Sequence, residues 1–134
     1  RRLPGFFHTE NRQIPMLREL HRDPVVEIHP ETAKKEGIKE DHWVIIESAR
    51  GKVRQRAKYF AGIDPRIVSA EHAWWFPEKK EPGYGWAESN INILTDNAYE
   101  SCDPAMGATH IRTLLCRIYP EIQKGDERVW GNTV

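Results

Sequence analysis

Alternation of apolar and polar positions recurs along the first two thirds of the chain and predicts a series of short β-strands. Several of these runs are also rich in β-branched and aromatic residues, which favour strands. The predicted strands are residues 25–30 (VVEIHP), 43–48 (WVIIES), 53–60 (VRQRAKYF) and 66–70 (RIVSA). Residues 50–52 (Arg-Gly-Lys) lie between the second and third runs. This spacing favours a hairpin.

Helix-start and helix-end residues occur together after the first strand. Pro30 can open a helix, and Glu31 and Thr32 favour its first turn. Gly37 is suited to ending it. The sequence therefore predicts one short helix here, and one further helical turn at residues 16–20 within an otherwise irregular N-terminal segment.

The second half of the chain is dominated by loops. Residues 72–89 are predicted to form a long aromatic loop, because they combine five aromatic residues with several prolines and glycines, which break regular secondary structure. Residues 91–94 are predicted to form a brief strand, and residues 97–109 are predicted to form a loop. Residues 110–120 fit either a strand or a helix, and the run Leu-Leu-Cys favours a buried final strand. We expect the polar tail, residues 123–134, to be loose.

Many short strands, few helices and frequent Gly and Pro indicate a mainly β fold, either a barrel or a sandwich. The chain of 134 residues has the length of one domain, which we predict to span residues 1–122, followed by the tail 123–134. Because the sequence opens with Arg1 and not with Met or a signal peptide, we expect it to be a piece of a longer protein.

Composition excludes several classes of protein. Lys plus Arg and Asp plus Glu are both 20, so the formal net charge of zero gives no reason to expect a nucleic-acid partner. No apolar run approaches the roughly 18 residues of a membrane helix, so we expect no membrane insertion. The two cysteines, Cys102 and Cys116, are too few for a disulfide scaffold and match no metal motif.

Local catalytic motifs are missing from the sequence. It contains no GxSxG elbow, no phosphate-binding glycine loop, no HExxH and no CxxC. We therefore name no catalytic residue and no metal ligand.

Polar and aromatic side chains suited to holding a ligand gather instead in three predicted loop regions, residues 8–13, 72–76 and 90–96. Residues 89–97 (SNINILTDN) raise a particular question, because Asn is a poor strand residue. Either this segment is a turn-rich connection, or its amides face a ligand with many polar edges.

Several segments, in this order, resemble one known family. They are FHTENRQIP, DPVVEIHPETAKKEGIKEDHWVIIESARGKV, IDPRIVSAEHAWWFPE, ESNINILT, CDPAMG and RTLLCRIY. Together they resemble the C-terminal molybdopterin dinucleotide-binding domain of the dimethyl-sulfoxide-reductase superfamily of molybdopterin oxidoreductases. The similarity covers about residues 3–119, which is most of the chain.

The resemblance implies a double-psi β-barrel with one or more short helices. It implies a cofactor, bis-molybdopterin guanine dinucleotide carrying molybdenum or tungsten, with any iron–sulfur cluster elsewhere in the full-length protein. The implied partners are the other domains of the same catalytic subunit and an iron–sulfur electron-transfer subunit. The resemblance leaves the compartment undecided between the cytoplasm and the periplasm of a prokaryote. The isolated chain is expected to be inactive, since the redox chemistry belongs to the whole subunit.

The resemblance also implies cofactor-binding residues, and it does so on several separate segments of this chain. These residues are His8, Thr9, Asn11, Arg12, Gln13, Trp74, Trp75, Asn90, Asn92 and Arg112. In this interpretation Arg12 pairs with a phosphate, since its planar fork offers two parallel donors. Asn92 contacts the pterin, because a carboxamide carries both donors and acceptors.

Other interpretations stay open. Asn92 also suits a turn cap, and Arg12 a surface arginine. The aromatic residues Trp74, Trp75 and Phe76 also suit a core position or a plug between domains. A double-psi barrel can also serve as a free-standing binding module or as a small subunit without redox activity. A self-processing decarboxylase barrel is a further alternative, but it needs a Gly-Ser pair, and this sequence has none.

Overall fold

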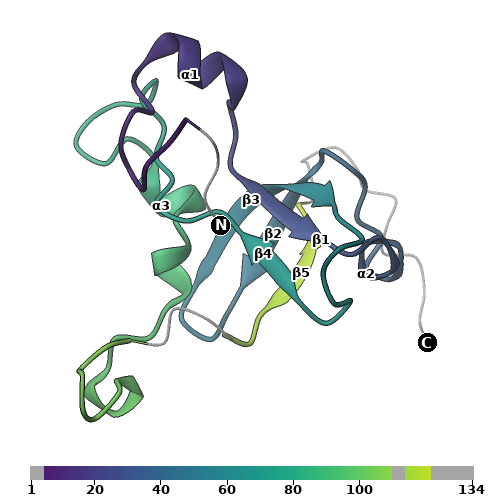
Figure 1. Cartoon of the computed structure of the whole chain (residues 1–134), viewed down its shortest axis with the longest axis vertical. Helices are drawn as coiled ribbons and strands as arrows, with labels where there is room; N and C mark the ends of the chain where they lie inside the picture. The colour runs from purple at the N-terminus through teal and green to yellow at the C-terminus, as the bar shows by residue number, and fades with distance from the viewer. Residues whose placement is uncertain (1–4, 110–113, 122–134) are drawn as a thin grey trace.

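The computed structural model describes residues 5–109 and 114–121 and is mostly β, with a few short helices (Figure 1). Its strands are β1 (Val25–Ile28), β2 (Trp43–Glu47), β3 (Lys52–Tyr59), β4 (Val68–Ala70) and β5 (Arg117–Pro120). Its helices are α1 (Pro15–Leu20), α2 (Pro30–Lys35) and α3 (Trp86–Ser89), with the 3-10 turns η1 (Ile91–Leu94) and η2 (Tyr99–Ser101). The mainly β fold class is confirmed, and the double-psi form of the barrel stays a prediction.

The five strands form one curled sheet in the order β4-β1-β3-β2-β5 (Figure 1). The pair β1 and β3 is parallel, and the other three pairs are antiparallel. The central strand β3 therefore lies between β1 and β2. Along the chain, β1 leads through α2 to β2, and β2 then forms a hairpin with β3. In Figure 1 the segment that precedes β1 and the loop that follows β4 lie together on one side of the sheet.

The alternation in the sequence decides which side chains enter the core. In β2, Val44 and Ile46 are buried while the positions between them are half-buried. In β3 the inward positions are Val53, Gln55 and Ala57, and Gln55 is the polar exception. The apolar cluster is completed by side chains of β1, α2, η1 and the turn after α2: Val26, Ile28, Ala33, Ile38 and Leu94.

The predicted helix after β1 is confirmed as α2. Pro30 occupies its first turn, and the His29 Nδ1 atom accepts a hydrogen bond from the Glu31 backbone N–H. Gly37 has a φ of +67° just after the helix, which is the left-handed conformation that glycine adopts most readily. The helical turn predicted at residues 16–20 is likewise present as α1.

The strand predicted at residues 91–94 is wrong, because this segment is the 3-10 turn η1. Asn90 caps it, since the Asn90 Oδ1 atom accepts from the Asn92 backbone N–H at 3.0 Å. This local bond competes with strand pairing, as short polar side chains commonly do. Leu94 then enters the core while Asn92 remains exposed.

At the C-terminal end, β5 pairs with β2 and lies at the edge of the sheet. The strand interpretation is therefore confirmed for Arg117–Pro120, but these residues are exposed or half-buried, so the expectation of a buried strand is wrong. Arg112 and the tail 123–134 lie outside the described residues. None of the helices in residues 5–109 and 114–121 has the length and apolar character needed to cross a bilayer.

Candidate functional site

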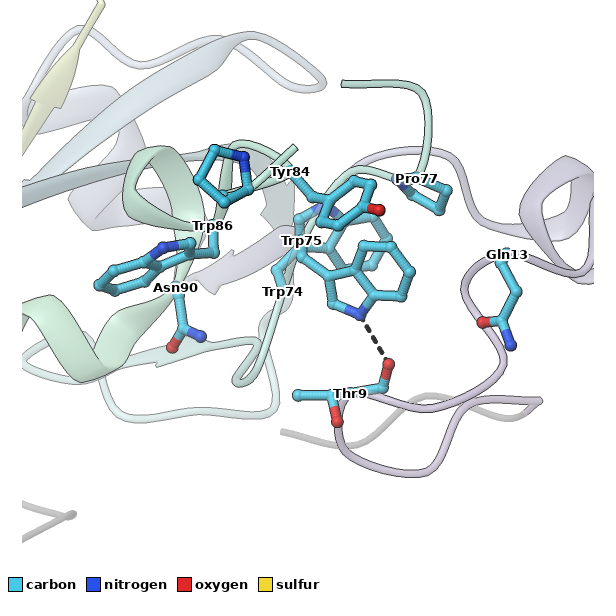
Figure 2. Close-up of a pocket in the computed structure, with 10 residues that line it drawn as sticks. Thr9, Gln13, Trp74, Trp75, Pro77, Tyr84, Trp86 and Asn90 are labelled. Carbon is cyan, nitrogen blue, oxygen red and sulfur yellow. Dashed lines mark hydrogen bonds between the residues drawn. The ribbon is translucent and has the colours of Figure 1, made fainter. Parts of the chain in front are cut away.

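A groove of about 630 Å³ opens where the N-terminal loop meets the aromatic loop (Figure 2). Its walls come from two segments that are far apart in sequence, residues 9–13 and 74–90. The lining residues are Thr9, Gln13, Trp74, Trp75, Pro77, Pro82, Gly83, Tyr84, Trp86 and Asn90. Five of the ten predicted cofactor-binding residues are among them: Thr9, Gln13, Trp74, Trp75 and Asn90.

Among the described residues, the lining of the groove contains aromatic rings and neutral polar groups and no charged side chain. Aromatic faces stack on flat rings, and carboxamides such as those of Gln13 and Asn90 can both donate and accept hydrogen bonds. In Figure 2 the Trp75 side chain lies between those of Trp86 and Gln13. The arrangement suits an uncharged, flat heterocycle with polar edges better than it suits a phosphate group.

The indole of Trp75 connects the two loops that form the groove. Its Nε1 atom donates to the Thr9 backbone carbonyl at 2.6 Å, drawn as the dashed line in Figure 2. Its ring meets that of Tyr84 edge to face with centroids 5.5 Å apart. Tyr84 is held in turn, because its carbonyl accepts from the Phe76 backbone N–H at 2.8 Å. Trp75 is therefore fixed from both sides.

Trp74 forms the floor of the groove and is fully buried. Its ring lies edge to face with Phe6 and Phe76, each at a centroid distance of 6.1 Å. The guanidinium carbon of Arg12 lies 3.9 Å from the centroid of the Trp74 ring, a cation–π contact. The core interpretation thus applies to Trp74, while Trp75 is half-buried at the groove surface.

Arg12 points inward and not toward solvent, with an exposed fraction of only 1%. Its Nε atom donates to the Ala73 carbonyl at 3.3 Å, and its Nη2 atom donates to the His8 carbonyl at 3.0 Å. Burial lowers the pKa of Arg12 to about 10, and the nearby Glu71 carboxylate opposes that lowering. Arg12 does not line the groove, and its predicted pairing with a phosphate stays a prediction.

Of the other predicted residues that the structure describes, His8, Asn11 and Asn92 do not line the groove. The ring atoms His8 Nδ1 and His72 Nε2 are 3.0 Å apart and share one hydrogen bond. Asn11 is half-buried with a φ of +68°. Asn92 is exposed, and the capping role considered for it belongs to its neighbour Asn90. Both interpretations of this Asn-rich segment, a turn and a ligand-facing surface, apply to Asn90, which caps a turn and also lines the groove.

Several residues that build the site were missed. Tyr84 and Trp86 line the groove, and the signal was their membership of the same aromatic, Pro- and Gly-rich loop. Gln55 and Glu71 are buried polar residues behind it. A polar residue at an inward position of β3 was the available signal for Gln55, while the sequence offered none for Glu71. The described residues hold no cluster of His, Cys, Asp or Glu suited to a metal ion.

Asp96, at the end of the Asn-rich segment, supports a prediction about pH. Hydrogen bonds from the Ala98 backbone N–H, then from the Ser101 hydroxyl and Arg50, lower the pKa of Asp96 to about 2. A pKa lowered by folding stabilises the native state above the unfolded-state value of about 3.9. That stabilisation disappears as the pH falls toward 2.

We therefore expect Asp96→Asn to be less stable than the unchanged chain at pH 6, and expect the difference to shrink between about pH 4 and pH 2. Urea denaturation at a series of pH values measures this difference. A difference that stays constant over the whole range would contradict the prediction.

Comparison with known proteins identifies the family. Residues 1–112 match the family model described as "Molydopterin dinucleotide binding domain". The dopamine dehydroxylase of Eggerthella lenta is 42% identical over 119 residues, which are 89% of this chain and 12% of that protein. The acetylene hydratase of Syntrophotalea acetylenica is 26% identical over 119 residues, covering 84% of this chain and 16% of that protein.

A solved structure agrees with these matches. The acetylene hydratase from Pelobacter acetylenicus superimposes with a TM-score of 0.79 at 25% sequence identity, covering 89% of this chain and 17% of that one. The chain thus spans about an eighth to a sixth of the length of these relatives. On these matches and on its fold, the chain belongs to the molybdopterin dinucleotide-binding domain family of the dimethyl-sulfoxide-reductase superfamily of molybdopterin oxidoreductases.

Proposed function

We propose that this chain binds a molybdopterin guanine dinucleotide within a larger oxidoreductase and that the groove receives a heterocyclic part of that cofactor. The observation that carries the proposal is the groove itself. Two segments distant in sequence, residues 9–13 and 74–90, bring Thr9, Trp75 and Asn90 into one neutral, aromatic wall. Family membership supplies the class of cofactor, and the groove supplies a surface that fits its flat rings.

The residues present fit such a group in two respects. The indole of Trp75 offers a flat surface for a ring, and it is already immobilised by Thr9 and Tyr84, so little side-chain entropy is lost on binding. The amide groups of Gln13 and Asn90 provide hydrogen-bonding edges at the wall.

When bound, the cofactor supplies a molybdenum or tungsten centre for two-electron redox chemistry. The chain's own residues hold the organic part of the cofactor and exclude water from it. The second cofactor of a bis-dinucleotide site, any iron–sulfur cluster, the remaining domains and an electron-transfer subunit are proposed to belong to the rest of the assembly. The residues that select the substrate are proposed to lie in the rest of the assembly as well.

The first test uses the complete protein, expressed from its natural gene and purified without oxygen. We expect molybdenum or tungsten by mass spectrometry, and about two guanosine monophosphates per metal after acid release. Folded protein with neither metal nor guanine would contradict the proposal and would favour a barrel used as a binding module without redox activity.

The second test asks whether the groove is the binding surface. Loss of a stacking partner costs about 1–3 kcal/mol, or roughly 5- to 150-fold in affinity. We therefore expect Trp75→Ala to lower the guanine content of the purified protein. Tyr99→Ala is the matched control, because Tyr99 is exposed and does not line the groove. Equal guanine content in the two variants would place the cofactor elsewhere.

A further inference from the structure

Both loops that border the groove contain a strained backbone residue. His8 has a φ of +52° and Ala73 a φ of +57°, a region that residues with a Cβ rarely adopt. Such conformations are energetically unfavourable and persist only where the surroundings hold them. Each strained residue immediately precedes a residue of the groove lining, Thr9 or Trp74. The structure must therefore contain something that holds these two positions.

The Arg12 guanidinium holds both of them. It donates to the carbonyl oxygens of His8 at 3.0 Å and Ala73 at 3.3 Å, the same two residues that carry the strain. It also packs on the Trp74 ring at 3.9 Å and on the ring of a second aromatic residue, Phe6, at 4.8 Å. One planar side chain thus connects the N-terminal loop to the aromatic loop beneath the groove.

A buried cation needs a counter-charge, and Glu71 provides it. Its Oε1 atom lies 3.8 Å from Arg12 Nη2, and the two side chains are only 2% and 1% exposed. The other oxygen, Oε2, accepts from His21 Nε2 at 2.9 Å and from the Val25 backbone N–H at 3.2 Å.

The backbone of Glu71 is fixed to the sheet as well. The Gln55 amide of β3 donates to the Glu71 carbonyl at 2.7 Å and accepts from the Glu71 N–H at 3.0 Å. Glu71 is therefore anchored to β1 through its carboxylate and to β3 through its backbone, and its ion pair with Arg12 connects both loops to the sheet.

We propose that Arg12 and Glu71 form a positioning pair that sets the geometry of the groove before the cofactor binds. Neither residue lines the groove, so the pair acts through Thr9 and Trp74 and not by touching the cofactor. The proposed role requires both the charge and the planar shape of the side chain at position 12. A lysine at position 12 would keep the charge, but its single ammonium group lacks the planar fork that reaches two carbonyl oxygens at once. This inference rests on the proposed function of the groove.

The test compares variants of the complete, anaerobically purified protein. Arg12→Lys removes the fork, and Glu71→Gln removes the counter-charge while keeping the shape. Ile46→Val is the matched control, because it deletes one buried methylene from the apolar core cluster, which includes no residue of either loop, and lowers stability. The readouts are amide hydrogen exchange in peptides covering residues 5–14 and 71–76, guanine and metal content per folded protein, and the electron paramagnetic resonance signal of the metal.

We expect at least tenfold faster exchange in both peptides, lower guanine content and an altered resonance signal in Arg12→Lys and in Glu71→Gln. In Ile46→Val the thermal midpoint should fall while exchange in these peptides, cofactor content and signal stay unchanged. If Arg12→Lys does not fold, Glu71→Gln decides the matter by the same readouts.

Unchanged exchange in both loop peptides would overturn the positioning pair. Loss of cofactor with unchanged exchange would also overturn it, because Arg12 would then act by direct contact. Absence of metal and guanine from the unmodified protein would instead contradict the proposed function. In that case the exchange measurements alone would decide whether Arg12 and Glu71 hold the two loops.

Discussion

Replacing Trp74 with alanine is expected to lower the free energy of unfolding by about 3–5 kcal/mol, the range found for deleting a buried aromatic side chain. The Trp74 ring is fully buried among Phe6, Phe76 and the Arg12 guanidinium, so its removal leaves a cavity that these neighbours fill only in part. The variant also removes one of the two aromatic rings on which the buried Arg12 packs. Urea denaturation followed by circular dichroism measures the effect.

Trp86→Ala is the control for this prediction. Trp86 also lines the groove, but 45% of its surface is exposed, so the expected loss is about 1 kcal/mol or less. Equal losses in the two variants would show that the floor formed by Trp74 contributes no more to stability than the rim of the groove.

Replacing Gln55 with leucine is expected to lower the free energy of unfolding by about 2–5 kcal/mol. Leucine has a similar volume, so the change isolates the hydrogen bonds. The Gln55 Nε2 atom donates to the carbonyl oxygens of Glu71 at 2.7 Å and Ser89 at 3.1 Å, all in a buried environment. A buried carbonyl left without a donor costs about 1–3 kcal/mol, and here two carbonyls lose theirs.

Lys58→Gln is the control, since Lys58 lies on the same strand, β3, with its side chain exposed. We expect this change to stay within about 0.5 kcal/mol. A Gln55→Leu variant as stable as the unchanged chain would mean that the added apolar burial offsets the lost bonds, as it does in some cores. The link from the sheet to Glu71 would then be dispensable for stability.

Much of the scaffold could be predicted from the sequence, because the signals are local. The alternation of Val44 and Ile46 with half-buried neighbours depends only on the two-residue period of a strand. The start of α2 at Pro30 and the turn at Gly37 depend on backbone preferences of single residues. The same local logic was misleading at residues 91–94, where the cap by Asn90 replaced strand pairing with a 3-10 turn.

The sequence by itself determined the mainly β scaffold, the short helices α1 and α2 and the family, together with five of the residues that line the groove. It predicted a loop where the structure has the helix α3. The tertiary structure alone decided the direction of Arg12 and the existence of its partner Glu71, which lies 59 positions further along the chain. It also decided that Tyr84 and Trp86 close the groove. The physical reason is that local periodicity indicates which face of a helix or strand is buried. The partners of a buried charge depend instead on which distant carbonyls and carboxylates the fold brings close to it.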